Sequence, residues 1–515
     1  MAAPGKALSR ATAWSAVSGT WLLRLLLVLF FLSGISGLIY QVLWLRVLSL
    51  VFGVTIFAVS TVLASFMAGL AVGSFGAGKV ADRLRNPLAA YGVVEVLIGL
   101  TALVTPELIL GLQGPYKGLY EATGGAPLLV GGVRIALAFL ILLVPTSLMG
   151  ATLPIVIKSS LMRSEGLSQN VSLLYAVNTF GAIVGAASAG FFLVGSLGIR
   201  STTNVAAAIN LLVGLSALLA ARFLVGSGEA PAGQTAGVEV APAEAAPAVP
   251  ATAQRLVFWA FGLSGFLSLA YEVVWSRALA MFFNSSIYAF TVMLSTVLLG
   301  IAVGSWAINP LMRRRWNWMA VFAGLELLVA LSAMLSIITL GEMYPITGWM
   351  QSVPGLRRIL STDIRFMAVV AFLAIFPPMF LLGMTFPVAA RVYAANAADA
   401  GRRIGAIYSA NVFGAIFGSV VAGFLLVPHL GSQGTLVLLA VGNFLIGVAL
   451  LWTAPGLAPR LRAAGTAVPL GLLLLLAALA PAMYPNIFAG REEWLRTRPF
   501  VPEDSFCAGQ TVWYE

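Results

Sequence analysis

Charged side chains are scarce in this sequence. Asp, Glu, Lys and Arg make up 9% of the 515 residues and hydrophobic residues make up 60%, whereas a soluble domain carries about 25% charged residues. The mean hydropathy is +0.98. This composition excludes an ordinary soluble protein and predicts an all-α integral membrane protein whose first partner is the lipid bilayer.

Cysteine and histidine occur once each, as Cys507 and His429. A single cysteine cannot close an internal disulfide, and these two residues cannot complete a Cys/His metal site. The sequence also lacks a glycine-rich phosphate loop or a serine nucleophile motif after a strand. We therefore expect no catalytic residue, no metal and no cofactor, and an enzyme in its own right is the least supported function class.

Acidic residues are fewer than basic ones, 18 against 29, which gives a net charge of +11. In a soluble protein this excess would suggest nucleic-acid binding. Here Lys and Arg lie mostly in short loops beside apolar segments, without a basic–aromatic stripe. The excess therefore indicates membrane topology, and we expect no nucleic-acid partner.

Apolar runs of about 20 residues, the length that a membrane-spanning helix needs, recur along the chain. The predicted spans of the first half are 22–51, 54–81, 88–112, 132–158, 170–195 and 200–223. Those of the second half are 255–283, 286–312, 317–341, 365–392, 403–427 and 433–453, and a further apolar run covers 465–484.

The predicted units are a first six-helix repeat (1–224), a flexible linker rich in Ala, Pro and Gly (225–252), a second six-helix repeat (253–455), an extra transmembrane helix (456–485) and a polar tail (486–515).

The two halves are copies of each other. Residues 32–48, LSGISGLIYQVLWLRVL, match 263–279, LSGFLSLAYEVVWSRAL. Two further blocks match, 145–154 with 378–387 and 175–191 with 408–424. Because each half has an even number of spans, both halves have the same orientation, and we predict parallel repeats related by an axis along the membrane normal.

Charge predicts the orientation. If the N-terminus is cytoplasmic, the inner loops hold most of the Lys and Arg, as the positive-inside rule requires. Lys117, Arg357 and Arg358 are exceptions in outer loops. We therefore expect a cytoplasmic N-terminus and a cytoplasmic central linker.

Two resemblances follow from these patterns. Twelve spans in two halves, with GKVADRLR at 78–85, resemble the major facilitator superfamily; its loop signature is matched at Gly78, Asp82 and Arg83 but lacks the later glycine. The motifs SGxxGLxYQVLWLRxL, YEVVWSRAL, the paired GxxxGS and PxxLMGxTLP resemble the membrane region of bacterial fused spermidine synthase-like proteins.

The second resemblance covers nearly the whole chain and implies the bacterial cytoplasmic (inner) membrane. In that family an aminopropyltransferase-like domain follows the membrane part. Here GQTVWYE at 509–515 looks like the opening strand of that domain, whose nucleotide-binding core and catalytic Asp have no counterpart. Aminopropyl transfer would thus require a separately supplied synthase-like domain.

Polar residues in the repeated blocks are the candidates for substrate binding. Tyr40 and Gln41 are equivalent to Tyr271 and Glu272, and Glu272 is the one carboxylate of this group. An unpaired, ionised carboxylate in lipid is costly, so Glu272 must face the interior, pair with a cation or hold a proton. The alternative is that these residues bond neighbouring helices and anchor the interface.

A second candidate set lies on spans 5 and 11. It contains the equivalent residues Asn178 and Asn411, together with Tyr175 and Tyr408. The Asn amides could bind substrate or clamp neighbouring helices.

Four charged residues form two predicted structural ion pairs. Glu95 and Glu326 are equivalent, as are Lys158 and Arg391, and all four lie at a similar predicted depth. We therefore expect the pairs Glu95–Lys158 and Glu326–Arg391.

Small residues and prolines are also duplicated. GxxxG motifs begin at Gly69, Gly181, Gly300 and Gly414; they allow close helix contact, either between the two halves or within each half. Pro145 and Pro378 lie near mid-span and predict kinked helices, either beside a binding site or as static bends.

These observations support two functions. The first is a transporter that works by alternating access; the family resemblance implies a polyamine or another small cation as its substrate. The second is a non-transporting membrane platform for an aminopropyltransferase-like (spermidine synthase) domain.

Overall fold

The computed structural model describes residues 5–52, 55–80, 83–112, 114, 118, 121, 127–157, 167–225, 250–283, 286–314, 316–360, 363–394 and 400–483. The elements of the first half are α1 (Gly5–Phe52), α2 (Thr55–Val80), α3 (Pro87–Gly111), α5 (Pro127–Ile157), α6 (Leu167–Ser188), the π-helix η3 (Ala189–Leu193) and α7 (Val194–Val225).

The second half repeats this order. Its elements are α8 (Ala251–Phe283), α9 (Ser286–Ile308), the 3-10 helix η4 (Leu311–Arg313), α10 (Trp318–Gly341), α11 (Met343–Ser352), α12 (Pro354–Leu360), α13 (Asp363–Ala394), α14 (Ala400–Val421), the π-helix η5 (Ala422–Leu426) and α15 (Val427–Thr453), and α16 (Pro459–Leu479) follows. The predicted all-α fold is confirmed.

The helices have membrane-crossing length. Within the described residues, 11 helical stretches are long and apolar enough to cross a bilayer. Two of them, Ala176–Arg222 and Arg403–Thr453, turn back at the equivalent glycines Gly198 (φ 77°) and Gly431 (φ 69°). A positive φ favours glycine, so these residues allow one span to follow the next without a loop.

Packing is duplicated as well as sequence. In the first half α1 packs on α6, α2 on α5 and α3 on α7; in the second half α8 packs on α14, α9 on α13 and α10 on α15. Each pair in one half is thus the equivalent of a pair in the other.

The GxxxG glycines hold these pairs together. A Cβ at Gly73 would overlap the carbonyl oxygen of Ser147 on α5, and one at Gly185 would overlap that of Ile35 on α1. The remaining glycines of the four motifs likewise face helices of their own half: Gly69, Gly181, Gly300, Gly304, Gly414 and Gly418. Of the two alternatives, close packing within each half is therefore the observed one.

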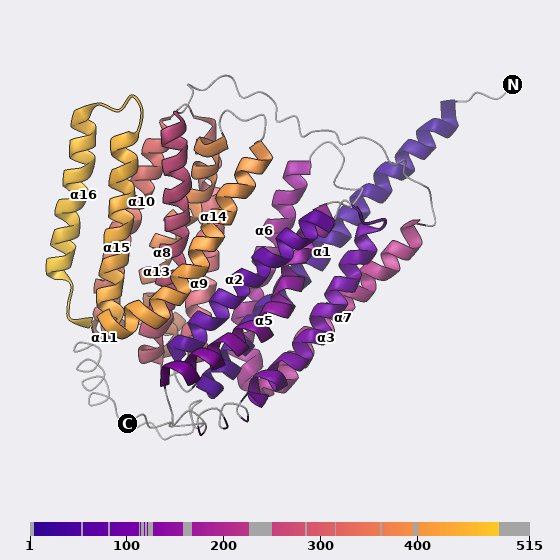
Figure 1. Cartoon of the computed structure of the whole chain (residues 1–515), viewed down its shortest axis with the longest axis horizontal. Coiled ribbons are helices and arrows are strands. Elements are labelled where there is room, and N and C mark those ends of the chain that lie inside the picture. Colours follow the sequence, from indigo (N-terminus) through magenta and orange to yellow (C-terminus); the bar gives the residue numbers. More distant parts are fainter. Residues whose placement is uncertain are drawn as a thin grey trace.

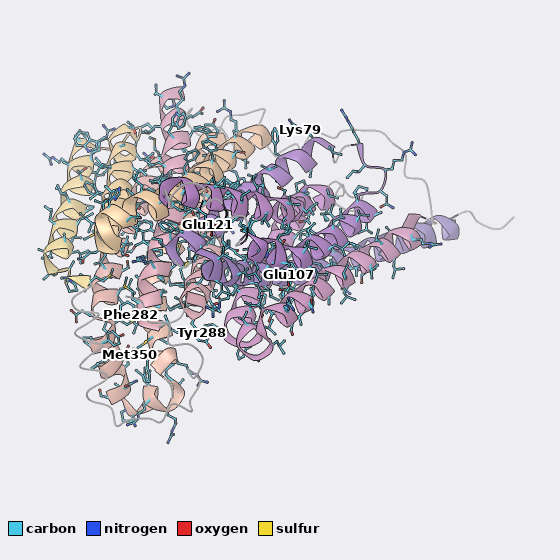
Figure 2. The ribbon with its side chains drawn as sticks, turned by 60° about the horizontal axis from the view of Figure 1, so that its bottom comes forward. Lys79, Glu107, Glu121, Phe282, Tyr288 and Met350 are labelled. Atoms are coloured by element: carbon cyan, nitrogen blue, oxygen red, sulfur yellow. The ribbon has the colours of Figure 1, made fainter. Side chains whose placement is uncertain are left out.

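The two bundles lie side by side and are inclined to each other (Figure 1). They contact through α2 with α14 and through α6 with α9, which are equivalent combinations. Figure 2 shows Lys79, at the end of α2, on the opposite side of the molecule from Phe282 and Met350. We call the end where α2 and α9 begin the contact end.

The extra helix α16 packs on α10 and α15, outside the duplicated bundles. At its end the Gln433 side-chain amide donates to the Pro481 carbonyl (3.0 Å) and its oxygen accepts from the Met483 N–H (2.9 Å). Gln433 lies near the start of α15, at the contact end. Residue 483 therefore lies at the contact end, whereas α7 ends and α8 begins at the opposite end.

Candidate functional site

A buried chain of hydrogen bonds crosses the first half. The Tyr40 hydroxyl of α1 donates to Asn210 Oδ1 of α7 at 2.9 Å. Asn210 Nδ2 donates to Glu95 Oε2 of α3 at 2.6 Å, and Ser33 Oγ donates to Glu95 Oε1 at 2.6 Å. Tyr40 and Glu95 are both 0% exposed. Three helices are thus tied together around one acidic group.

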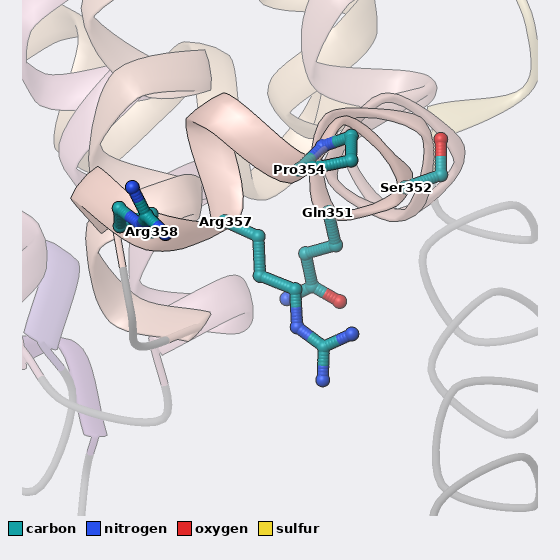
Figure 3. A pocket seen from close by; sticks show the side chains of 5 residues that line it. All are labelled: Gln351, Ser352, Pro354, Arg357 and Arg358. Atoms are coloured by element: carbon teal, nitrogen blue, oxygen red, sulfur yellow. The ribbon is translucent and has the colours of Figure 1, made fainter.

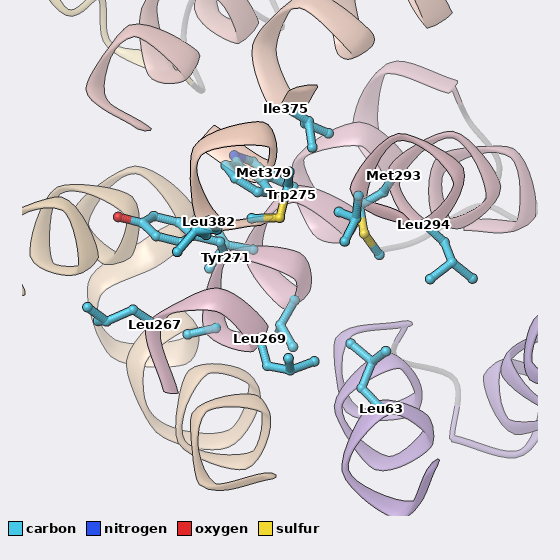
Figure 4. Close-up of a cluster of buried hydrophobic side chains, with 14 of the residues drawn as sticks. Leu63, Leu267, Leu269, Tyr271, Trp275, Met293, Leu294, Ile375, Met379 and Leu382 are labelled. Atoms are coloured by element: carbon cyan, nitrogen blue, oxygen red, sulfur yellow. The ribbon is translucent and has the colours of Figure 1, made fainter. Parts of the chain in front are cut away.

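The second half contains the same chain. The Tyr271 hydroxyl of α8 donates to Asn443 Oδ1 of α15 at 2.8 Å, and Asn443 Nδ2 donates to Glu326 Oε2 of α10 at 2.6 Å. The Tyr271 ring stacks on Trp275, with centroids 5.1 Å apart, inside the core seen in Figure 4. We call these two chains the Tyr–Asn–Glu relays.

The structure shows other partners for Glu326 and Arg391 than the predicted ion pair. Glu326 is buried and accepts from Asn443, whereas Arg391 is exposed, packs over the Trp318 ring and donates to the Met312 carbonyl. Lys158 lies outside the described residues. A buried amide in mid-span donates to one oxygen of the Glu326 carboxylate, and the cation at the helix end stays near the surface.

The second candidate set holds helices together. Asn178 Nδ2 donates to the Phe30 carbonyl on α1 at 3.0 Å, and Asn411 Nδ2 donates to the Phe261 carbonyl on α8 at 2.9 Å. These are the helix clamps that the sequence offered as the alternative to substrate binding. Tyr408 is 50% exposed and lies against Phe386; the side chain of Tyr175 lies outside the described part.

Gln41 and Glu272 differ from the other polar candidates. They are 2% and 6% exposed, on α1 and α8, and neither side chain makes a hydrogen bond or an ion pair within the described chain. Glu272 lies three residues after Leu269, on nearly the same helix face. Leu269 lies beside Leu63 of α2 (Figure 4), so this face is turned toward the other half.

The halves meet through two equivalent contacts at the contact end. Phe424 of η5 stacks on Phe57 of α2 with ring centroids 4.9 Å apart, and Phe191 of η3 stacks on Tyr288 of α9 at 6.1 Å. Each contact includes a glycine whose added Cβ would overlap a hydroxyl of the other half: Gly423 at Ser60 and Gly190 at Thr291. We call these eight residues the seam.

The seam contains local irregularities. Both η3 and η5 are single π-helical turns inside otherwise α-helical stretches, a feature that is frequent at functional sites. Ser60 Oγ and Thr291 Oγ1 are buried without a hydrogen-bond partner among the described residues, although Ser419 Oγ donates to the Ser60 carbonyl at 3.0 Å. Such unsatisfied buried groups are uncommon in folded proteins.

Sequence reasoning missed Asn210 and Asn443. They are equivalent residues on α7 and α15, and the repeat could have identified them as a duplicated polar pair inside apolar spans. The helices α5 and α13 both continue through the equivalent prolines Pro145 and Pro378, where the sequence predicts kinks.

No protein-family model matches this chain, and no curated protein matches it. Among solved structures, a bacterial homolog to the human lysosomal transporter Spinster, in an inward-facing and unoccupied conformation, is 14% identical over 94% of this chain and 99% of that chain, with a TM-score of 0.49. An inward-facing and occupied conformation is 12% identical over 94% and 98%, with a TM-score of 0.43.

The chain is an all-helical, multi-pass membrane protein. Its described residues contain no cluster of three or more His, Cys, Asp or Glu that could hold a metal ion.

Proposed function

We propose that this protein is a membrane transporter that moves a small organic cation, such as a polyamine, by alternating access between its two halves. The observation that carries the proposal is the seam, where duplicated bundles meet through two equivalent contacts at one end. Rocking of one half on the other would break both contacts together.

The distribution of exposed side chains supports such movement. The seam residues lie at the contact end, near the starts of α2 and α9. Toward the other end of α2 and α9, the large apolar side chains of Phe75 and Trp306 are exposed, and midway along α6 and α14 those of Phe180 and Phe413 are exposed. The halves are thus held together more closely at one end than at the other.

Glu272 supports a cation as the substrate. It is a buried carboxylate in a membrane span without a basic partner among the described residues, and its helix face is turned toward the other half. An ionised carboxylate in this position is costly unless a cation or a proton neutralises it. An ammonium group would neutralise Glu272, with Gln41 as a hydrogen-bonding partner. The choice of a polyamine among small organic cations comes from the family resemblance.

The alternative function is a platform for an aminopropyltransferase-like domain. If the N-terminus and linker are cytoplasmic, the path of α16 puts residue 483 on the outer side. A synthase domain attached there would be separated from its cytosolic decarboxylated S-adenosylmethionine. This geometry favours the transporter over the platform.

Uptake of labelled spermidine into proteoliposomes tests the transporter directly. We expect wild-type protein to take up spermidine and Glu272→Gln to lose most of this uptake, because the amide keeps the shape but cannot neutralise an ammonium group. Glu107→Gln is the matched control, since Glu107 is exposed and paired with Arg200 (3.0 Å); it should transport like wild type. A folded wild-type protein that neither binds nor moves polyamines would remove this substrate class.

A further inference from the structure

A short helical hairpin, α11–α12, covers the contact end of the second half between α10 and α13. Its first helix is firmly seated, because Met343, Tyr344, Thr347 and Met350 are buried and the Tyr344 ring packs against Phe282 with centroids 5.7 Å apart. The hairpin is therefore a fixed part of the bundle. Because α10 ends at Gly341, directly before it, the hairpin lies at the depth of the membrane surface.

The outward side of the hairpin has the composition of a membrane interface. Trp349 of α11 is 66% exposed, and Ile359 of α12, which directly follows the exposed basic residues Arg357 and Arg358 in sequence, is 70% exposed. Tryptophan and arginine gather at the headgroup level of bilayers, where an apolar body meets a polar surface.

A cavity of about 350 Å³ opens between the two short helices. It is lined by Gln351, Ser352, Pro354, Arg357 and Arg358. Figure 3 shows the side chains of Gln351 and Arg357 extending in the same direction from α11 and α12. The lining contains two guanidinium groups, one amide and one hydroxyl but no carboxylate, so its chemistry suits an anion.

The charge of this cavity is uncompensated in the described chain. Neither Arg357 nor Arg358 has a salt-bridge partner there, whereas the exposed Arg200 at the same end is paired with Glu107. Both arginines also depart from the positive-inside rule, because they lie in a predicted outer loop. Membrane topology therefore does not account for them.

We propose that the α11–α12 cavity binds the phosphate of an anionic lipid headgroup. The guanidinium groups match phosphate geometry, the cavity lies at headgroup depth, and Trp349 and Ile359 would contact the acyl region beside it. This site would anchor the second half at the contact end.

Native mass spectrometry of the full chain with defined lipids tests the site. We expect wild-type protein to retain phosphatidylglycerol in preference to phosphatidylcholine. The double variant Arg357→Gln, Arg358→Gln should lose this preference by roughly 5-fold for each arginine, which corresponds to about 1 kcal/mol per basic residue at an anionic surface.

The double variant Arg222→Gln, Arg255→Gln is the matched control, because it removes two exposed arginines from the opposite end; it should retain the preference. Both double variants change exposed residues and should fold, which size-exclusion chromatography would check. Equal retention of phosphatidylglycerol by the wild type and the Arg357/Arg358 variant would overturn the proposal. So would competition by millimolar inorganic phosphate, which would indicate a soluble anion, or a preference that appears only after deletion of the tail 486–515, which would indicate that the tail occupies the cavity.

Discussion

At the residue scale, the Tyr–Asn–Glu relays show how this chain keeps acidic groups inside apolar spans. Each carboxylate accepts from an asparagine amide, whose own oxygen is satisfied by a tyrosine hydroxyl. In lipid an unsatisfied polar group costs several kcal/mol. The hydrogen bonds of each relay lower this cost by giving the buried polar groups partners, and they join three helices.

Stepwise removal of the relay should give graded losses of stability. Tyr271→Phe deletes one hydroxyl and should cost about 0.6–1.7 kcal/mol, the range for interhelical hydrogen bonds in membranes. Asn443→Leu removes the donor to buried Glu326 and should cost more, about 1–3 kcal/mol. Thermal unfolding in detergent would measure both, and Tyr40→Phe and Asn210→Leu should behave alike.

Tyr393→Phe is the control for these variants. Its ring packs on Phe258, but its hydroxyl makes no hydrogen bond within the described residues. This variant should melt like wild type. Equal melting of Asn443→Leu and Tyr393→Phe would refute the relay as a stabilising network.

The repeat allowed the sequence to predict which polar residues matter but not what they bind. Glu95, Glu326 and Tyr271 were recognised as duplicated positions in apolar spans. Their partners were missed because opposite charges at a similar depth in the membrane were paired, which assigned Arg391 to Glu326. The depth of a residue in its span does not show which helices pack together, so an asparagine amide on a neighbouring helix could not be identified in this way.

At the element scale, close helix packing rests on duplicated glycines. On α2, Gly73 lies directly against the carbonyl of Ser147, whereas nothing lies within 4 Å of a Cβ added at Gly76 one turn along. On the same helix, a side chain added at Gly73 would therefore overlap a neighbouring helix, whereas one added at Gly76 would meet no other atoms.

Alanine substitution at these two glycines should therefore diverge. We expect Gly73→Ala to destabilise the protein by about 1–3 kcal/mol, because the added methyl forces α2 away from α5. Gly76→Ala should be neutral or slightly stabilising, since alanine favours the helix. The surviving monodisperse fraction after heating measures the difference, and identical survival curves would contradict the packing described here.

Span positions were predictable from the sequence within a few residues because about 20 apolar residues suffice to cross a bilayer. Which face of each helix contacts which neighbour was not predictable from the sequence. The GxxxG motifs fitted both a contact between halves and a contact within each half, and only the packing distinguishes them. The π-helical turns η3 and η5 likewise had no recognised sequence signal, although both lie in duplicated segments, AGFFL and AGFLL.

At the scale of the whole molecule, alternating access requires movement at the seam. Two equivalent glycines, Gly190 and Gly423, let η3 and η5 approach the other half, and Ser60 and Thr291 lie unsatisfied against them. A larger side chain at either glycine should separate the halves at the contact end. If the halves rock as rigid bodies, the opposite end should close in response.

Distances between pairs of attached spin labels, measured by double electron–electron resonance across both ends of the molecule, test this rocking movement without knowledge of the substrate. Replacing the single cysteine, Cys507→Ser, provides the background. Labels would occupy equivalent exposed positions: Leu197 and Leu430 report on the contact end, and Phe75 and Trp306 report on the opposite end.

The decisive comparison is wild type against Gly423→Val in lipid nanodiscs, with Gly195→Val as a control, since nothing lies within 4 Å of a Cβ added at Gly195. Rocking halves predict that Gly423→Val lengthens the 197–430 distance and shortens the 75–306 distance, while the control changes neither. A folded Gly423→Val protein in which both distances stay unchanged, or lengthen together, would contradict alternating access.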